Sequence, residues 1–394
     1  MEIFNSELLP ASFFVLALFA GFYMAWNIGA NDVANAMGTS VGSHAITLMT
    51  AVIIAAIFEF SGAYFVGESV TTTVRKGIIE TSYFQNPEHI NLLLFGMLSA
   101  LLAAGTWLLL ATRMGWPVST THSIVGAIVG VGLITGGAEI IQWSKLGEIS
   151  ASWVTSPLMS GTIAFFIFTA IRRYILDSTS PVQAVRKYGF HILFLSFVVM
   201  ISILLIKGFK HVEFISSMTL SVKILISILI SLIISLIFNA FIRKYLDRSI
   251  VAKSEQKSSS SEEDSLSVEL KDSIKQLSAI KNKSKIEYQA KLNQVLEDIN
   301  EIIFDIDAKT AGIDISAEFK VVERVFAIIQ VVSASFVAFA HGANDVANAI
   351  GPLATIVAIG HDGVAAISAK TPVSPWLLAC GGIGIVIGLA TWGY

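Results

Sequence analysis

The sequence is poor in charged residues and has almost no cysteine. Asp, Glu, Lys and Arg make up 14% of its 394 residues, whereas a soluble chain carries roughly a quarter. No Lys or Arg precedes Arg75, and Glu2 and Glu7 stand before the first apolar run, so the basic start of a signal peptide is missing. The single cysteine, Cys380, excludes a disulfide framework. The net charge of −3 gives no indication of nucleic-acid binding, and no nucleic-acid partner is expected.

Apolar residues are abundant instead. They make up 54% of the sequence, and the mean hydropathy is +0.72, which predicts an all-α polytopic protein of the cell membrane, surrounded by the lipid bilayer. A helical span needs about 20 residues. We therefore expect membrane segments at residues 11–34, 46–67, 91–112, 123–141, 153–171, 190–206, 222–242, 325–348, 351–360 and 375–392.

One octapeptide occurs twice. Gly-Ala-Asn-Asp-Val-Ala-Asn-Ala fills Gly29–Ala36 and returns as Gly342–Ala349, each time at the end of an apolar run. A single carboxylate there could mark the point where a helix leaves the membrane. Two matching copies favour a functional role, because a carboxylate in hydrocarbon costs about 2.5–3.5 kcal/mol and usually faces an ion or substrate path. The flanking glycines and small residues let the backbone loosen or let another helix approach closely, as in the broken helices of transporters that expose carbonyl groups to ions.

The spacing inside the octapeptide indicates a cation site. Asp32 and Asn35 are three residues apart and share one helix face, as do Asp345 and Asn348. Their oxygens suit a hard cation such as Na⁺. Glu59, in another apolar run, is a further intramembrane acid. It could be an ion ligand, or it could form a hydrogen bond between packed helices.

Basic clusters suggest how the chain crosses the membrane. Arg172-Arg173, Arg186-Lys187 and Arg243-Lys244 flank two apolar segments and are expected in the cytoplasm, whereas the acidic start favours an N-terminus outside. The two octapeptides then enter the membrane from opposite sides, which predicts inverted-topology repeats with a substrate site near the midplane. We predict a first transmembrane repeat at 1–177, a linking helix pair at 178–248, a cytoplasmic helical insert at 249–322 and a second repeat at 323–394.

The insert differs in character from the rest. Ser258–Asp264 is a polar linker that cannot bury enough apolar area to order itself. Apolar residues at helical spacing then predict two amphipathic helices, the first from Leu266 to Leu277 and the second from Tyr288 to Ile306, separated by the basic stretch Lys281 to Lys285. The insert is expected to be a helical hairpin or a dimerisation helix, and a regulatory role stays open.

A second motif, Pro117-Val118-Ser119-Thr120-Thr121-His122, lies between apolar stretches. The stretch that follows is too short to span the membrane, which predicts a re-entrant hairpin. Proline is favourable at a helix start. Hydroxyls and free backbone N–H groups in the first helical turn can bind an oxyanion without Lys or Arg, although ordinary capping explains the pattern equally well. His122 is expected to pack or to form a hydrogen bond.

The two motifs constrain each other. An anion beside Asp32 and Asp345 would be repelled unless cations lay between them, since unit charges about 4 Å apart interact by about 4 kcal/mol at an intermediate dielectric. Obligatory cation binding implies symport, and Na⁺ suits these ligands. Protonated aspartates would also relieve the repulsion, so H⁺ coupling stays open.

Together the two octapeptides and the Pro117–His122 motif resemble the signatures of the inorganic phosphate transporter (PiT) family. The resemblance covers nearly the whole chain apart from the insert. It implies two inverted repeats with broken helices and re-entrant hairpins, phosphate held between them, symport with Na⁺, and a homodimer. No other cofactor is expected.

The resemblance also implies roles for single residues. Those carried over for phosphate are Asp32, Asn35, Ser119, Thr120, Thr121, Asp345 and Asn348. Those carried over for Na⁺ are Asn31, Asp32, Asn35, Asn344, Asp345 and Asn348. Glu59 matches an acid that the family uses in transport.

The sequence departs from the family pattern at its end, because no second Pro-x-Ser-x-Thr-His motif precedes Tyr394. We therefore expect a C-terminally truncated piece that does not transport by itself. An H⁺-coupled phosphate permease and a sulfate permease are alternatives. A phosphate sensor would bind without flux. An intramembrane aspartyl protease also needs two buried aspartates, but its Gly-x-Gly-Asp motif is missing, so no enzyme is expected.

Overall fold

The computed structural model describes residues 10–209, 213–254, 269–278, 280, 286–310, 315–363, 365–368 and 373–393. These residues are almost entirely helical, and the only β-pairing among them is an isolated bridge between Ile79 and Ile141. The polar linker Ser258–Asp264 and the basic stretch Lys281 to Lys285 lie outside the described residues.

Eight helices within this part of the chain are long and apolar enough to cross a membrane. They are α1 (Ala11–Gly42), α2 (Leu48–Lys76), α3 (Pro87–Arg113), α5 (Trp143–Ile171), α6 (Pro181–Ile203), α8 (Leu220–Ser254), α11 (Ile315–Asp362) and α13 (Pro375–Trp392). Helix α4 (Thr120–Gly136) is apolar but has only 17 residues. The prediction of an all-α polytopic membrane protein is confirmed.

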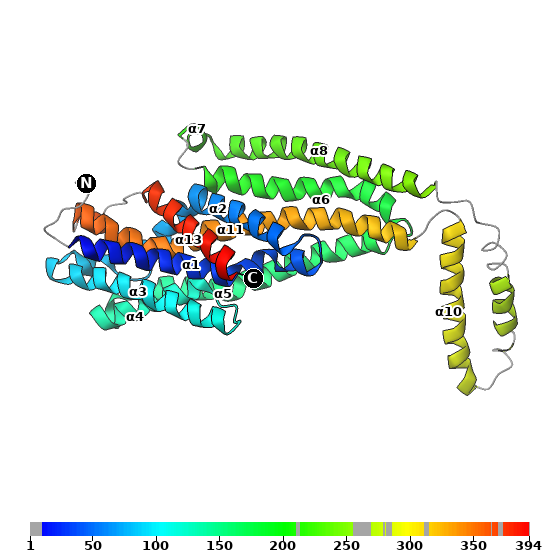
Figure 1. Cartoon of the computed structure of the whole chain (residues 1–394), viewed down its shortest axis with the longest axis horizontal. Coiled ribbons are helices and arrows are strands. Elements are labelled where there is room, and N and C mark those ends of the chain that lie inside the picture. The colour runs from blue at the N-terminus through cyan, green and yellow to red at the C-terminus, as the bar shows by residue number, and fades with distance from the viewer. Residues whose placement is uncertain are drawn as a thin grey trace. The chain divides into compact units, whose positions relative to one another are not determined.

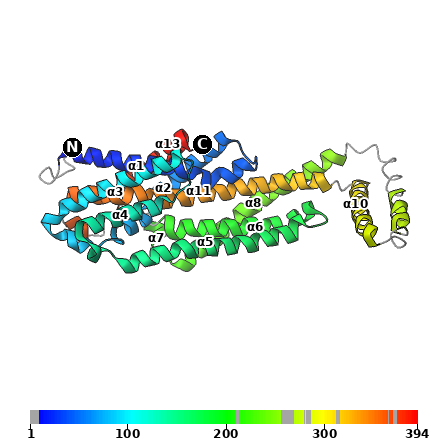
Figure 2. The ribbon, with the colours of Figure 1, turned by 90° about the horizontal axis from the view of Figure 1, so that it is seen from below.

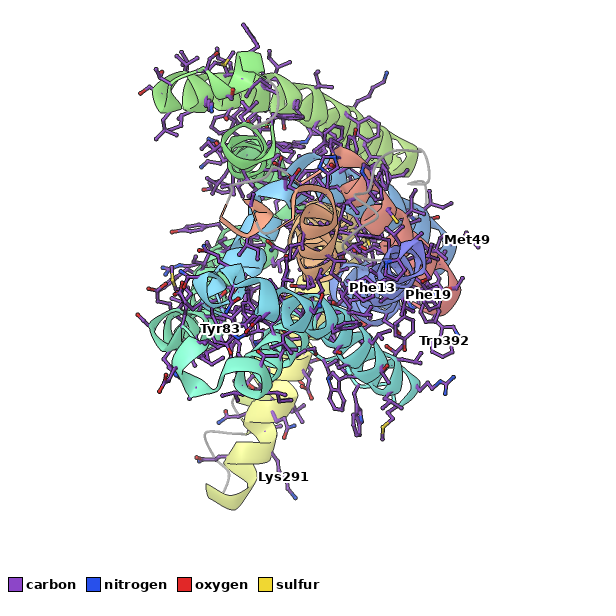
Figure 3. All side chains as sticks on the ribbon, turned by 90° about the vertical axis from the view of Figure 1, so that its left-hand side faces the viewer. Phe13, Phe19, Met49, Tyr83, Lys291 and Trp392 are labelled. Atoms are coloured by element: carbon purple, nitrogen blue, oxygen red, sulfur yellow. The ribbon has the colours of Figure 1, made fainter. Side chains whose placement is uncertain are left out.

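The outward-facing side chains fit that class. Phe19 and Met49 are 63% and 69% exposed and point away from the helices around them (Figure 3). The membrane-length stretch of α5 has no buried residue at all. Apolar faces of this extent need a hydrocarbon environment.

Two sequence predictions about helix continuity are wrong. The octapeptides do not break their helices, because α1 runs unbroken through Gly29 and α11 through Gly342. Helix α11 also continues through Pro352 and so joins the two separate segments expected at 325–348 and 351–360. The glycines serve close helix packing instead: a Cβ on Gly29 would overlap the carbonyl oxygen of Ile385.

The chain divides into two compact units. The first comprises Met1–Gly161, Val198–Ile230 and Ala327–Tyr394. In its core, α1 packs against α13, α3 and α2, and α3 packs against α4 (Figures 1 and 2). Large side chains that are fully buried there include Met24, Ile28, Leu101 and Leu108.

Two close helix crossings in the first unit correspond to each other. Gly29 of α1 meets the backbone of α13 at Ile385, and Gly342 of α11 meets the backbone of α2 at Glu59. Each partner helix also carries a glycine at its crossing, three residues after the contact residue Ile385 or Glu59. Gly388 of α13 approaches the backbone of Trp26, and Gly62 of α2 approaches that of Phe339, which follows Trp26 by the same 313 residues that separate the octapeptides. The repeat in sequence is therefore also a repeat in packing.

Helices α3 and α4 form a hairpin. Its two ends are tied together: the Tyr83 hydroxyl donates to the carbonyl of Thr135 at 3.2 Å, and the Ile79–Ile141 bridge lies beside them. The tip comprises residues 114–119, where Gly115 has a left-handed φ of 68°. The start of α3 and the end of α4 thus lie side by side. The motif Pro117–His122 lies at the opposite end of the hairpin, where α3 turns into α4.

The second unit comprises Thr162–Phe197 and Ser231–Phe326. Helices α6 and α8 pack through Phe197 and Phe238, whose ring centroids are 5.9 Å apart. Within the predicted insert, residues 269–278 and α10 (Ile286–Thr310) are helical. The prediction of two helices in the insert is confirmed over these residues.

Candidate functional site

A cavity of about 390 Å³ joins the three sequence motifs in the first unit. Its walls come from α1, α11, the hairpin tip and the first turn of α4. The lining residues are Asp32, Asn35, Pro117, Val118, Ser119, Thr120, Thr121, His341 and Asp345. No Lys or Arg is among them.

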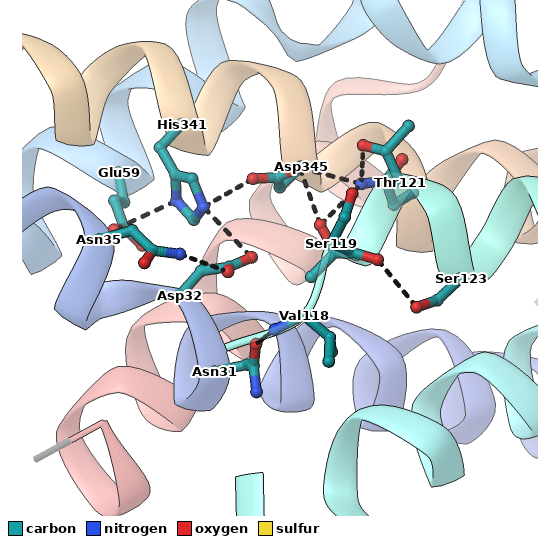
Figure 4. Close-up of polar contacts among 12 residues, drawn as sticks. Asn31, Asp32, Asn35, Glu59, Val118, Ser119, Thr121, Ser123, His341 and Asp345 are labelled. Atoms are coloured by element: carbon teal, nitrogen blue, oxygen red, sulfur yellow. Dashed lines mark hydrogen bonds and ion pairs between the residues drawn. The ribbon is translucent and has the colours of Figure 1, made fainter. Parts of the chain in front are cut away.

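His341 lies at the centre of the acidic groups (Figure 4). Its Nε2 is 2.7 Å from Asp345 Oδ2 and 3.3 Å from Asp32 Oδ2, and its Nδ1 is 3.4 Å from Glu59 Oε1. Only the protonated imidazole carries an N–H on both nitrogens and can meet carboxylates on both sides. The side chain thus stands where a cation shared by Asp32 and Asp345 would bind.

Sequence reasoning missed His341, although the sequence holds a signal for it. The residue immediately before the octapeptide is Ile28 in the first copy and His341 in the second. A histidine in one copy, where the other copy has an apolar residue, could have indicated a functional side chain at this position.

Glu59 is entirely buried. Neither carboxylate oxygen has a hydrogen-bond partner among the described residues. The imidazole of His341, which is positively charged when protonated, lies beside Oε1. Glu59 of α2 thus faces His341 of α11 across packed helices, and Glu59 as an ion ligand stays a prediction.

The second asparagine of each octapeptide, Asn35 or Asn348, donates a hydrogen bond to the aspartate of the same octapeptide. Asn35 donates to Asp32 Oδ1 at 3.0 Å, and Asn348 donates to Asp345 Oδ1 at 2.9 Å. The predicted common helix face is therefore observed in both copies. Each carboxylate is held by its own amide, which leaves its second oxygen directed at His341.

The first turn of α4 supplies the hydroxyls. Ser119 is the N-cap, and its side chain accepts from the backbone N–H of His122 at 3.2 Å. Thr120 donates to Asp345 Oδ1 at 3.1 Å, and the Thr121 hydroxyl accepts from Asn348 at 3.1 Å. Capping is thus confirmed for Ser119, while the two threonines connect α4 to the second octapeptide. His122 packs on Trp153, with ring centroids 3.9 Å apart.

Two predicted residues lie elsewhere. Asn31 contacts the hairpin tip rather than the cavity. Asn344 is exposed and does not line the cavity. The structure therefore does not bring these two amides to the carboxylates.

The donor atoms of Asp32, His341 and Asp345 all lie within 4.8 Å of one another. Four carboxylate oxygens at one wall and the N-terminus of a helix at the other give the cavity an acidic side and a side of positive dipole potential. Such a cavity can hold an oxyanion against α4 when cations balance the carboxylates.

Apolar spans, an internal repeat and a polar cavity between the repeated helices define this protein as a membrane transporter. Residues 28–394 match the model of the phosphate transporter family. The chain belongs to that family, so the resemblance found in the sequence is confirmed and the protease alternative is set aside.

Individual relatives agree. Inorganic phosphate transporter 2-1, chloroplastic, of Arabidopsis thaliana is 39% identical, over 96% of this chain and 56% of its own length. A protein of Pyrococcus abyssi is 38% identical, over 96% of this chain and 75% of its own length. A solved structure described as the sodium-dependent phosphate transporter is 32% identical, with a TM-score of 0.72, over 97% of this chain and 76% of that one.

Proposed function

We propose that the chain carries the site of a Na⁺-coupled symporter of inorganic phosphate that works by alternating access. One observation carries the proposal: Asp32 and Asp345 face the N-terminus of α4 across a single cavity whose lining includes no Lys or Arg. An anion can enter there only together with cations, because the carboxylates would otherwise repel it.

Each wall has its own role in this proposal. The backbone N–H groups at the start of α4, with the hydroxyls of Ser119, Thr120 and Thr121, hold phosphate. Asp32 and Asp345, held by Asn35 and Asn348, bind Na⁺ and through it the phosphate. Carboxylate and amide oxygens are the ligands that hard cations prefer.

The solved relative supports Na⁺ as the coupling ion, since it is described as sodium-dependent and matches 97% of this chain. Alternating access would require His341 to leave its position between the carboxylates when Na⁺ arrives. Glu59 is then the partner to which the imidazole can turn, because it already lies 3.4 Å from Nδ1. In this way Glu59 would couple cation binding to transport.

Proton coupling is the second candidate, and His341 is the observation that favours it. An imidazole in contact with three acids could accept and release the coupling proton. In that case the cation at the centre of the site would be the imidazolium itself.

The deciding experiment is uptake of ³²P-phosphate into proteoliposomes that contain this chain extended through the second Pro-x-Ser-x-Thr-His hairpin of the family pattern. An inward Na⁺ gradient at equal pH on both sides is compared with a pH gradient without Na⁺. We expect uptake that follows the Na⁺ gradient and is lost in Asp345→Asn. Uptake driven only by the pH gradient would transfer the coupling to protons, and phosphate binding without flux under either gradient would favour the sensor.

A further inference from the structure

Asn31, which directly precedes the cation ligand Asp32, is tied to the hairpin by three hydrogen bonds, one to α3 and two to the tip. Figure 4 shows the one to Val118. Its Nδ2 donates to Thr112 Oγ1 at 2.9 Å and to the carbonyl of Trp116 at 3.1 Å. Its Oδ1 accepts from the backbone N–H of Val118 at 3.1 Å. The side chain is buried, at 8% exposure.

The direction of these bonds is fixed by the surroundings. The Thr112 hydroxyl donates to the carbonyl of Leu108 at 2.8 Å, so its oxygen is left to accept from Asn31. Both N–H groups of the Asn31 amide are therefore in use, and its oxygen faces a backbone donor. The amide oxygen is held by the Val118 N–H, and Asn31 is not among the residues that line the cavity.

The hairpin tip needs an external partner at this point. Pro117 has no N–H, and the flanking carbonyl of Trp116 and N–H of Val118 point to one side of the chain, where the Asn31 amide pairs with both. Both hydrogen bonds are partly buried, and backbone polar groups that are shielded from water are almost always satisfied. One residue beyond Val118 stands Ser119, the N-cap of α4. The position of Val118 thus sets where the first turn of α4 begins.

We infer that Asn31 is a positioning residue for the anion side of the cavity and not a cation ligand. Its amide holds the tip so that residues 119–121 face the carboxylates. Asn344, its counterpart in the second octapeptide, is exposed and makes no comparable hydrogen bonds to the described residues. That residues 119–121 bind phosphate rests on the proposed function. That Asn31 holds the tip in place rests on its three hydrogen bonds.

The test compares Asn31→Ala with Asn27→Ala. Asn27 is a matched control, since it is a buried asparagine one turn earlier on α1, and its Nδ2 donates only to the carbonyl of Tyr23. Thr112→Val removes one acceptor of Asn31 without changing α1 and serves if Asn31→Ala fails to fold. Hydrogen exchange of residues 114–122 is measured first, because it needs no ligand. Binding of ³²P-phosphate in Na⁺, and of ²²Na⁺ without phosphate, follow on the purified chain.

We expect Asn31→Ala to speed exchange of the Val118 amide and to weaken phosphate binding, each by about tenfold, because two partly buried backbone groups lose their partner. Binding of ²²Na⁺ should change by less than about twofold, and Asn27→Ala should change neither the exchange nor the phosphate binding. Thr112→Val should act in the direction of Asn31→Ala.

Loss of ²²Na⁺ binding in Asn31→Ala, with unchanged exchange at Val118, would overturn the inference and make Asn31 a cation ligand. If the unaltered chain binds no phosphate in Na⁺, the proposed function fails and the role in anion binding fails with it. The exchange result then still decides whether Asn31 holds the tip.

Discussion

At the residue scale, the site surrounds one histidine with three acidic side chains, so a single imidazolium cannot neutralise all of them. Glu59, Asp32 and Asp345 present three carboxylates to one imidazole within 3.4 Å. The octapeptide spacing correctly predicted which face of each helix carries Asp and Asn. His341 lies one turn before Asp345 on the same helix, so its place on that face could have been predicted from the spacing. The location of Glu59 beside it could not, because it depends on how α2 crosses α11.

Replacing Asp32 by Asn should lower the affinity for Na⁺ while leaving expression nearly unchanged. The substitution keeps the shape and the hydrogen bond to Asn35 but removes one of the charges that attract the cation. We expect at least about a tenfold rise in the Na⁺ concentration for half-maximal phosphate uptake. Normal Na⁺ dependence in this variant would contradict the assignment of Asp32 to the cation.

His341→Ala should make the fold depend on Na⁺. Without the imidazole, three buried or nearly buried carboxylates have no positive partner, and unpaired buried charge destabilises by several kcal/mol. We expect the melting temperature in choline chloride to fall by on the order of 5 °C relative to the unaltered chain, with most of the loss restored by NaCl. The measurement is thermal unfolding of purified protein in the two salts. Equal melting temperatures in both salts would show that Na⁺ does not bind where the imidazole stood.

The double substitution Thr120→Ala and Thr121→Ala should raise the half-saturating phosphate concentration about tenfold. The two hydroxyls contact Asp345 and Asn348 from the first turn of α4, so their loss loosens that turn and removes two groups that can bind phosphate. Phosphate uptake measured across a concentration series is the assay. Unchanged uptake would reduce the motif to helix capping, for which Ser119 alone suffices.

At the element scale, the glycines explain why the helices stay continuous. From the sequence, the glycines could loosen the backbone or admit another helix, and the family resemblance implied broken helices. The octapeptide glycines lie instead where two backbones cross too closely for any side chain, so tertiary packing outweighs propensity. Sequence alone cannot distinguish a glycine that loosens a helix from one that admits a neighbour.

The two crossings are equivalent in packing but not in chemistry. At the crossing of α11 and α2, His341 pairs with Glu59. At the crossing of α1 and α13, the corresponding residues are Ile28 and Ile385, both fully buried. The repeat therefore builds two similar helix pairs and places a titratable pair in only one of them.

Gly29→Ala should be strongly destabilising, whereas Gly38→Ala on the same helix should be tolerated. A methyl group on Gly29 would overlap the backbone of Ile385, and overpacking costs about 1–3 kcal/mol or more. A methyl group on Gly38 meets nothing within 4 Å and lowers the entropy of the unfolded chain, worth up to about 1 kcal/mol. Melting temperatures of the two variants test this. Equal tolerance at both positions would contradict the close crossing of α1 and α13.

At the scale of the whole molecule, hydropathy and length were enough to predict the class. The eight candidate spans overlap the long segments expected from the sequence. The division into two compact units could not be predicted, because α5, α6, α8 and α11 each run from one unit into the other while the sequence shows only uninterrupted apolar helices. The inverted orientation of the repeats stays a prediction.

The connectivity makes that orientation testable. The hairpin of α3 and α4 begins and ends at one end, as the bond between Tyr83 and Thr135 shows, so it returns the chain to the side from which it started. Five spans, α1, α2, α5, α6 and α8, then separate the N-terminus from the insert. An odd number of crossings puts the insert on the side opposite to the N-terminus, and the basic clusters favour the cytoplasm for the insert.

Cysteine labelling in intact cells decides the matter. Cys380→Ser removes the one native thiol, and single cysteines are then placed at two exposed positions, Ser217→Cys between α6 and α8 and Asn300→Cys in α10. Four crossings precede Ser217 and five precede Asn300. We expect a membrane-impermeant maleimide to label the first variant in intact cells and the second only after permeabilisation. Labelling of both without permeabilisation would mean that α8 does not cross the membrane, and the reverse pattern would place the N-terminus inside. Labelling of both would make the two octapeptide helices enter from the same side and remove the inverted relation on which alternating access depends. The reverse pattern would exchange the two sides and leave the inverted relation intact.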